Sequence, residues 1–287
     1  MKASELVLAP NGSLYHIHLT GKELADDVIL VGDPARVDMF KEIFDTIEFE
    51  SMNREIHALT GTYKSHRFTA ISTGMGTDNI DIVLTELDAA ANIDLAKGET
   101  MPQHRTLNLI RIGTSGSLQS DIPCGSLVAG KYAVGMDGLM NYYQGSQTLL
   151  DTELKEAFMK HMCFDDCFAH PYGARGSETL LQKVAFDMFQ GITATAPGFY
   201  APQGRDIRLH PAIENLNDKL AAFAYKDTRL TNLEMETSAI YGFSQLMGHN
   251  ALTICLIIAN RPNGDFLNDY HPQMHTTIEK ILNRLAR

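Results

Sequence analysis

Uninterrupted apolar runs alternate with helical patterns along this chain. The runs have the length of β-strands and lie at residues 27–32, 106–113, 126–133 and 251–259. Strands that stay apolar along their length are typical of a sheet buried on both faces. Between them, apolar residues recur with helical spacing at 34–44, 77–92, 152–162, 178–189, 211–224, 237–247 and 274–285.

This order of elements predicts an α/β fold in which helices cover both faces of one sheet. We also expect a hairpin at 57–63 and 68–72, a strand at 192–196, and Thr77 as a helix cap. The sequence contains no long linker or internal repeat, so we expect a single domain over residues 1–287. Ligands of such folds lie beyond the carboxyl ends of the strands.

The composition argues against several classes of protein. The chain has 24 Lys plus Arg against 35 Asp plus Glu, a formal charge of −11, which argues against broad binding to nucleic acid or anionic membranes. Four cysteines are too few for a disulfide scaffold, and no apolar run reaches the roughly 20 residues of a membrane helix. We therefore expect a cytoplasmic protein, with arginines gathered locally if the ligand is an anion.

Two strand ends carry candidate anion-binding residues. Gly32 and Arg36 flank a predicted helix start, where a main-chain N–H and a guanidinium can hold an anion; the alternative is an ordinary turn with a surface arginine. Arg111 lies inside an apolar strand, where an unpaired charge is costly. It needs an anionic partner, either a ligand or an internal Asp or Glu. Thr114 lies in the Gly-Thr-Ser-Gly segment that follows, which we interpret as a glycine turn able to cradle an oxyanion.

Two further segments suit a sugar and a flat ring. Glu236 falls near a helix N-terminus, where a carboxylate stays ionised and can accept hydrogen bonds from a diol; it could equally be a capping residue. The loop from Phe199 to Arg205 offers aromatic rings, then an amide and a guanidinium two residues apart, although it could be inert surface.

Metal binding receives little support. The segment His161-x-Cys163-x3-Cys167-x2-His170 lacks the usual zinc spacing. Three other histidines have no partner pattern, and we expect them on the surface: His104, His249 and His275. We expect no metal and no cofactor.

Six motifs together resemble the nucleoside phosphorylase-I family, and within it uridine phosphorylases. They occur in family order over about residues 15 to 265: GDPARV at 32–37, STGMGTDN at 72–79, LIRIGTSG at 109–116, FYAPQGR at 199–205, NLEMETSA at 232–239 and IIANR at 257–261. The resemblance implies a three-layer α/β/α domain around a mixed sheet. It also implies phosphorolysis, in which a nucleoside and phosphate give free base and ribose 1-phosphate.

The resemblance assigns roles to individual residues. It implies that phosphate is held by Gly32, Arg36, Arg111 and Thr114, with Arg54 supplied by a neighbouring subunit. It implies that ribose is held by Glu234, Met235 and Glu236, with His16 from the neighbouring subunit at the 5′-hydroxyl. It implies that the base is read by Phe199, Gln203, Arg205 and Arg261. The family is dimeric or hexameric, so we expect a homo-oligomer with shared sites, whose partners are a nucleoside and phosphate.

The chemistry of these residues is consistent with that reaction. Cleavage of the glycosidic bond builds positive charge on ribose and negative charge on the base. Phosphate stabilises the first, and donors from Gln203 and Arg205 stabilise the second; with Arg111, these are the candidate catalytic residues. Gln203 can accept from N3–H of uracil and donate to a carbonyl. Purine phosphorylases of the family have an Asp where this chain has Ala259 and Asn260, which favours a pyrimidine.

Some features depart from the family or leave alternatives open. Ala201-Pro202 replaces the expected residues before Gln203, and extra residues lie near 96–105 and 135–152, where they could alter the pocket cover or subunit contacts. A purine nucleoside phosphorylase, a nucleosidase of the same fold and a non-catalytic nucleoside-binding protein remain alternatives. Deoxyuridine or thymidine acceptance and a monovalent cation between subunits near Glu55 are also open.

Overall fold

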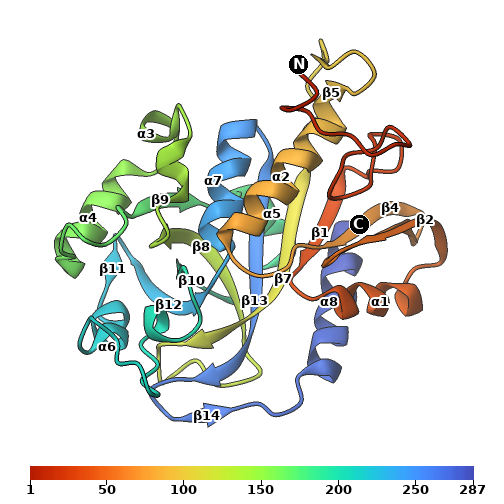
Figure 1. The fold of residues 1–287 in the computed structure, drawn as a ribbon. Coiled ribbons are helices and arrows are strands. Elements are labelled where there is room, and N and C mark those ends of the chain that lie inside the picture. Colours follow the sequence, from red (N-terminus) through yellow and green to blue (C-terminus); the bar gives the residue numbers. More distant parts are fainter.

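One mixed β-sheet runs through the molecule, with helices on both faces (Figure 1). The computed structural model describes residues 1–287. The strands are β1 (Asp27–Val31), β2 (Thr46–Asn53), β3 (Ile56–Tyr63), β4 (His66–Ser72), β5 (Ile93–Asp94), β6 (Glu99–Thr100), β7 (Asn108–Ser117), β8 (Leu127–Gly135), β9 (Tyr172–Arg175), β10 (Phe189–Thr195), β11 (Ala224–Tyr225), β12 (Thr228–Glu234), β13 (Asn250–Asn260) and β14 (Asp265–Phe266).

Helices fill the connections between strands. They are α1 (Pro34–Ile43), α2 (Thr77–Asn92), α3 (Ser146–Leu149), α4 (Thr152–Met162), α5 (Glu178–Val184), α6 (Leu216–Ala221), α7 (Thr237–Met247) and α8 (His271–Leu285), with short 3₁₀ turns η1 (Leu139–Tyr142) and η2 (Ala201–Gln203). None of these helices has the length and apolar character needed to cross a lipid bilayer.

The sheet order explains why distant motifs meet. The path is β11-β12-β10-β8-β13-β7-β1-β4-β3-β2, and β12 pairs a second time, antiparallel, with β7. This extra pairing joins Leu233 to Gly116 and closes part of the sheet on itself. β1, β7 and β13 run parallel, so their carboxyl ends lie at one edge. The end of β12 is thereby brought beside the end of β7.

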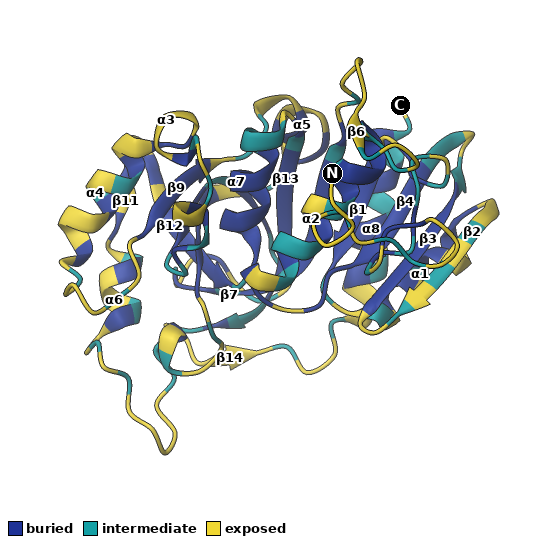
Figure 2. Cartoon of the chain, turned by 45° about the horizontal axis from the view of Figure 1, so that its top comes forward, coloured by how far each residue is buried: buried dark blue, intermediate teal, exposed yellow.

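The core follows the predicted layers. α2 and α7 pack on one face of the sheet, whereas α1, α5 and α8 pack on the other. Figure 2 shows the central strands almost entirely buried and β2 at an exposed edge. The α/β prediction and the mixed sheet implied by the family resemblance are confirmed. The extra segment 135–152 holds η1 and α3, which pack near α7.

Several local predictions are wrong. β7 continues through Gly113-Thr114-Ser115-Gly116 to Ser117, so the expected glycine turn is strand, because β13 and β12 pair with it there. Gly76, not Thr77, occupies the N-cap of α2, and α5 ends at Val184. α6 begins only at Leu216, although its helical pattern begins at Pro211. The strands at β2, β9 and β12 were not expected.

Candidate active site

A cleft of about 660 Å³ lies at the carboxyl ends of the central strands. It is lined by glycines, arginines and glutamates from five of the motifs and by apolar side chains from the end of β13 onward. Its lining residues are Gly32, Asp33, Pro34, Arg36, Glu55, Gly74, Met75, Asn79, Arg111, Thr114, Ser115, Gly116, Phe199, Gln203, Arg205, Leu233, Glu234, Met235, Glu236, Ile258, Ala259, Phe266 and Tyr270.

Arg36 is a buried cation in the wall of the cleft. It lies in the first turn of α1, which Asp33 caps by accepting from the N–H of Ala35 at 2.9 Å. The Arg36 side chain is only 7% exposed, and it donates to the Ile112 carbonyl at 3.3 Å. It forms no ion pair with any carboxylate, and a buried cation without a counter-ion is costly unless a ligand supplies the charge.

Arg111 is buried beside two carboxylates. Its Nη2 pairs with Oε2 of Glu236, and its Nη1 lies 3.5 Å from Oε2 of Glu234. Burial disfavours the cation, but the two carboxylates outweigh this and raise the pKa of Arg111. Gly113 makes room for the guanidinium, because a Cβ there would overlap it. The internal Glu partner considered for Arg111 is therefore present, and Arg111 also lines the cleft.

Glu234 and Glu236 have different surroundings. The Glu234 carboxylate accepts from the N–H groups of Glu236 and Thr237 at 3.0 Å and from the Thr195 hydroxyl at 2.8 Å, so it caps α7. Burial and the neighbouring Glu236 raise the pKa of Glu234 against the influence of Arg111. Glu236 accepts from the Gly76 N–H at 2.8 Å. Glu236 occupies the N-cap position of α7, as one alternative expected, but the side-chain hydrogen bond to the first N–H of the helix comes from Glu234.

Gln203 and Arg205 lie together at the carboxyl end of η2 and also line the cleft. Gln203 is 4% exposed, and its Oε1 accepts from Arg205 Nη1 at 2.7 Å. The Arg205 guanidinium lies 3.7 Å from the centre of the Phe199 ring. Burial, together with the nearby charge of Arg261, lowers the pKa of Arg205 to about 10. This part of the cleft therefore combines an aromatic face with an amide and a cation that has no carboxylate partner.

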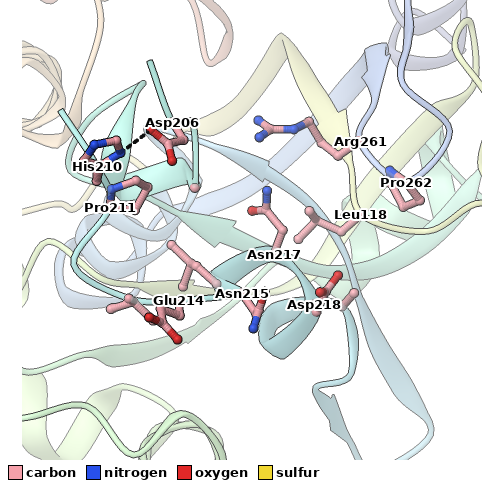
Figure 3. A pocket seen from close by; sticks show the side chains of 14 residues that line it. Leu118, Asp206, His210, Pro211, Glu214, Asn215, Asn217, Asp218, Arg261 and Pro262 are labelled. Atoms are coloured by element: carbon pink, nitrogen blue, oxygen red, sulfur yellow. Dashed lines mark hydrogen bonds and ion pairs between the residues drawn. The ribbon is translucent and has the colours of Figure 1, made fainter. Parts of the chain in front are cut away.

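Three predicted site residues lie outside this cleft. Arg261 lines a neighbouring hollow of about 610 Å³, which we call the outer hollow (Figure 3). Arg54 is exposed at the β2–β3 turn, with φ of 55°. His16 pairs through Nδ1 with Glu86 Oε1 at 2.6 Å. Arg54 and His16 are close in space, because the amide of Asn53 donates to the His16 carbonyl at 3.1 Å.

Comparisons with known proteins identify the family. Residues 26–287 match the model of the phosphorylase superfamily. The chain belongs to the phosphorylase superfamily. A nucleoside phosphorylase from Trypanosoma brucei, described as showing uridine phosphorylase activity, superimposes with a TM-score of 0.85 at 27% identity over 98% of both chains. The fold is therefore that of nucleoside phosphorylases.

Curated relatives of this superfamily member include both pyrimidine and purine enzymes. A uridine phosphorylase from Thermococcus kodakarensis is 28% identical over 263 residues, which is 89% of this chain and 80% of the relative. A DeoD-type purine nucleoside phosphorylase from Listeria welshimeri is 26% identical over 246 residues, which is 84% of this chain and 85% of the relative.

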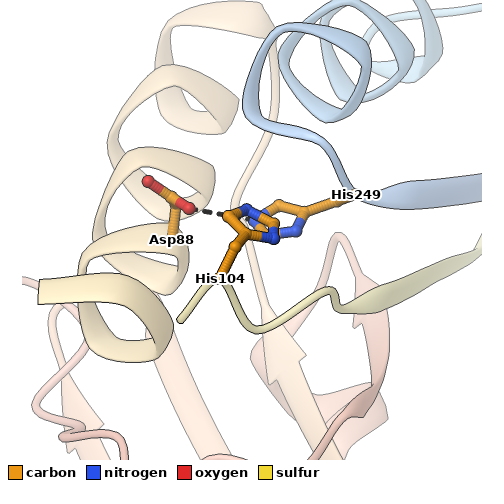
Figure 4. Close-up of side chains that lie close together, drawn as sticks. All are labelled: Asp88, His104 and His249. Carbon is orange, nitrogen blue, oxygen red and sulfur yellow. Dashed lines mark ion pairs between the residues drawn. The ribbon is translucent and has the colours of Figure 1, made fainter. Parts of the chain in front are cut away.

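Two clusters of histidine and carboxylate side chains resemble metal sites, but their hydrogen bonds fit other roles. In the first, His249 is buried, so our surface prediction for it is wrong (Figure 4). Its Nδ1 accepts from the Leu107 N–H at 3.2 Å, which places the ring proton on Nε2, 3.1 Å from Asp88. A protonated Nε2 faces the carboxylate with its N–H and has no lone pair for a metal.

The second cluster surrounds His57 and Glu50. Lys41 lies 2.6 Å from the Glu50 carboxylate and 3.0 Å from Asp38, where its ammonium group supplies the positive charge. The His–Cys segment at 161–170 does not form such a cluster. His161 instead meets the Lys219 carbonyl at 2.8 Å.

Two aromatic residues that line the cleft were not predicted from the sequence. Phe266 and Tyr270 come from the segment between β13 and α8 and line the cleft. The Arg36 guanidinium lies 5.9 Å from the centre of the Tyr270 ring, and Phe266 pairs with Ala259. An aromatic pair in a polar segment was the available signal. Neither extra segment, 96–105 or 135–152, contributes a lining residue.

Proposed function

We propose that this phosphorylase cleaves uridine with inorganic phosphate to give uracil and ribose 1-phosphate. The observation that carries the proposal is the base end of the cleft, where Gln203 and Arg205 meet without a carboxylate. Ala259 lines this region, and the amide of Asn260 is turned away to donate to two main-chain carbonyls at 2.9 and 3.0 Å. No acid is therefore placed to protonate a purine nitrogen.

Phosphate would bind at the opposite end of the cleft. Most of the guanidinium N–H groups of Arg36 have no partner, because only one of them donates to a carbonyl. Gly32 contributes main-chain atoms, and Arg111 and Thr114 also line the cleft. Charge-assisted hydrogen bonds from guanidinium groups suit a phosphate dianion. A clamped phosphate lies close to the sugar and replaces a bimolecular encounter by a positioned one.

Ribose would lie between these two ends. Glu236 retains lone pairs on its carboxylate for the two sugar hydroxyls, because a carboxylate offers about four acceptor sites. Met235 supplies an apolar contact to the sugar face. Glu234 would support the ribose site without binding the sugar directly, because its oxygens already accept hydrogen bonds at the start of α7 and face Arg111.

The reaction then needs stabilisation of two separating charges. As the bond from C1′ to the base nitrogen breaks, its electron pair moves onto the base and a phosphate oxygen forms the new bond to C1′. Phosphate stabilises the cationic sugar, while Arg205 and Gln203 stabilise the anionic base. Removing one such preorganised donor typically costs about 10²–10³ in rate.

Base choice would follow from the same pair of side chains. The Gln203 amide can accept from N3–H of uracil and donate to one carbonyl, and Arg205 donates to the other. Cytosine reverses two of these partners and leaves buried polar groups unpaired, which can support discrimination of about 10⁴ or more.

We further propose that Arg54 and His16 complete the cleft of a second copy of the chain. Both lie outside the cleft of their own chain, and Asn53 ties them into one exposed patch. Arg54 would add a third guanidinium to phosphate, and His16 would use its free Nε2 at the 5′-hydroxyl. Residues 1–287 would act as one domain within this oligomer.

A substrate panel tests the proposal. Uridine, cytidine, inosine and adenosine are each incubated with and without phosphate, and base release is followed by ultraviolet absorbance. We expect uracil release that depends on phosphate. Release of base from inosine but not from uridine would support a purine enzyme, the class to which the Listeria relative belongs. Release without phosphate would support a nucleosidase, and binding without release a non-catalytic protein.

A further inference from the structure

Asn217 joins the base end of the cleft to Arg261. It is the second residue of α6 and lines the outer hollow, where its side chain points toward that of Arg261 (Figure 3). Figure 3 draws the Asn217 amide nitrogen on the side of Arg261, where two donors face each other. Rotating the amide by 180° turns the nitrogen toward the base loop, so that it donates to the Gln203 carbonyl at 3.2 Å while the oxygen accepts from Arg261 Nη2 at 3.1 Å. This is the orientation in which both ends of the amide meet a partner of opposite character.

The base loop packs directly on this amide. Gly204 has φ of 67°, and a Cβ at this position would lie 3.0 Å from the Asn217 amide. The loop therefore approaches α6 more closely than a residue with a side chain would allow. Gln203, one residue earlier, projects its own side chain toward Arg205. A shift of the Gln203 carbonyl would consequently move the amide that faces the base.

The same contact holds Arg261 away from the cleft. Arg261 forms no ion pair, burial lowers its pKa, and its charge also contributes to the lowered pKa of Arg205. Its stem packs near Gly116, and its guanidinium lies in the outer hollow rather than in the cleft. Asn217 is its hydrogen-bond acceptor there.

We propose that Asn217 is a positioning residue that fixes Gln203 for base recognition, and that Arg261 acts through Asn217 rather than by touching the base. The proposal rests on the proposed function of the cleft. An amide suits this bridge because it donates at one end and accepts at the other. A carboxylate would keep the bond to Arg261 but would face the Gln203 carbonyl with a second acceptor.

Three variants test the bridge: Asn217→Leu, Asn217→Asp and Arg261→Met. Leu keeps the approximate volume and removes both hydrogen bonds, Asp keeps only the bond to Arg261, and Met keeps the stem of Arg261. We expect each to lower kcat/KM for uridine about tenfold, the scale of one hydrogen bond to a charged or buried group. The KM for phosphate should stay at the wild-type value, and the preference for uridine over cytidine should fall.

The double variant Asn217→Leu/Arg261→Met separates one bridge from two independent contacts. If Arg261 acts through Asn217, the double variant loses about tenfold, as each single variant does. A loss of about a hundredfold would mean independent contributions and would overturn the proposal. Unchanged selectivity in all three single variants would also overturn it.

Asp218→Ala is the matched control. Asp218 follows Asn217 in α6, lines the same hollow and makes no side-chain hydrogen bond, so this variant should keep wild-type kinetics. If Asn217→Leu lowers the thermal midpoint of unfolding, the nearly isosteric Asn217→Asp variant carries the test. Its loss of selectivity at an unchanged midpoint supports positioning, and wild-type selectivity overturns it.

Failure of the proposed function gives a different result. If the wild-type protein cleaves inosine rather than uridine, the proposed substrate is wrong, and the double-variant comparison is made with inosine. If it cleaves no nucleoside, hydrogen exchange of the 199–205 segment replaces activity. Equal increases in the single and double variants would support the bridge, and additive increases would overturn it.

Discussion

Arg111 and Glu236 form a buried ion pair across 125 positions of sequence. Glu236 also accepts from the Gly76 N–H, so three separate segments converge on one carboxylate. In the proposed reaction, phosphate needs Arg111 and ribose needs Glu236. The two substrates would therefore bind to opposite members of one ion pair.

Glu236→Gln should shift the balance between these substrates. The neutral amide no longer competes for Arg111, so we expect phosphate to bind about tenfold more tightly, the scale of a charge-assisted hydrogen bond. The kcat/KM for uridine should fall, and the preference over 2′-deoxyuridine should shrink. Calorimetry with phosphate and kinetics with the two nucleosides measure these effects. Weaker phosphate binding in this variant would contradict the role given to the pair.

Arg36→Met should separate stability from activity. The variant removes a buried cation that has no carboxylate partner, so its thermal midpoint should equal or exceed that of the wild type. The kcat/KM for phosphate should fall about 10²–10³-fold. As a control, Arg229→Met removes an exposed arginine paired with Asp121 and should leave the kinetics intact. A wild-type response to phosphate in Arg36→Met would exclude Arg36 from the phosphate site.

Subunit mixing tests the shared site. Arg36→Met damages the cleft of its own chain, whereas Arg54→Ala damages the cleft of the neighbour. Each variant alone should be nearly inactive, but co-expression should restore activity in mixed oligomers, because one cleft then has both arginines. A mixture as inactive as its components would show that Arg54 does not serve a second copy.

Asp88 should make stability depend on acid pH. Burial opposes its ionisation, but hydrogen bonds from His249 and Asn92 prevail and lower the pKa of Asp88 in the folded chain. Its contribution to the free energy of unfolding is therefore present above pH about 4 and is lost as the pH falls through the lowered pKa. Asp88→Asn should cost about 1–3 kcal/mol at pH 7, and this cost should shrink as the pH falls below about 4, as at pH 3.

Thermal unfolding of wild type and Asp88→Asn at both pH values measures this difference. Asp206→Asn is the matched control, because Asp206 pairs with His210 on the surface, where the side chains are 59% and 78% exposed. It should cost little at either pH. A deficit in Asp88→Asn that stays constant between pH 7 and pH 3 would contradict the assignment.

The central strands and most of the residues that line the cleft could be predicted from the sequence. A strand buried on both faces is a continuous apolar run, which is easy to recognise. α4 and α7 have the predicted bounds, and Arg111 was identified because a charge inside such a run needs a partner. β2 escaped prediction because it is an exposed edge strand with few apolar residues. The antiparallel pairing of β12 with β7 escaped it because no local pattern specifies a contact between Leu233 and Gly116.

Other residues gave no signal before the fold was known. Asn217 stands in a polar stretch, and only the packing of α6 on the base loop gives its amide two partners. His249 looked like a surface residue because Asp88 is distant in sequence. Such pairings depend on the tertiary fold rather than on propensity or periodicity.

Glu234 gives the cleft an uneven tolerance to change. Its carboxylate starts α7 and lies against Arg111, so the sugar-and-phosphate half is continuous with the folding core. The part of the cleft proposed to bind the base is formed by a surface loop that packs on a six-residue helix. Under the proposed function, substitutions in this loop and in α6 should change which base is released while the residues assigned to phosphate and sugar stay in place, which makes this scaffold a practical starting point for evolving enzymes that release other heterocycles.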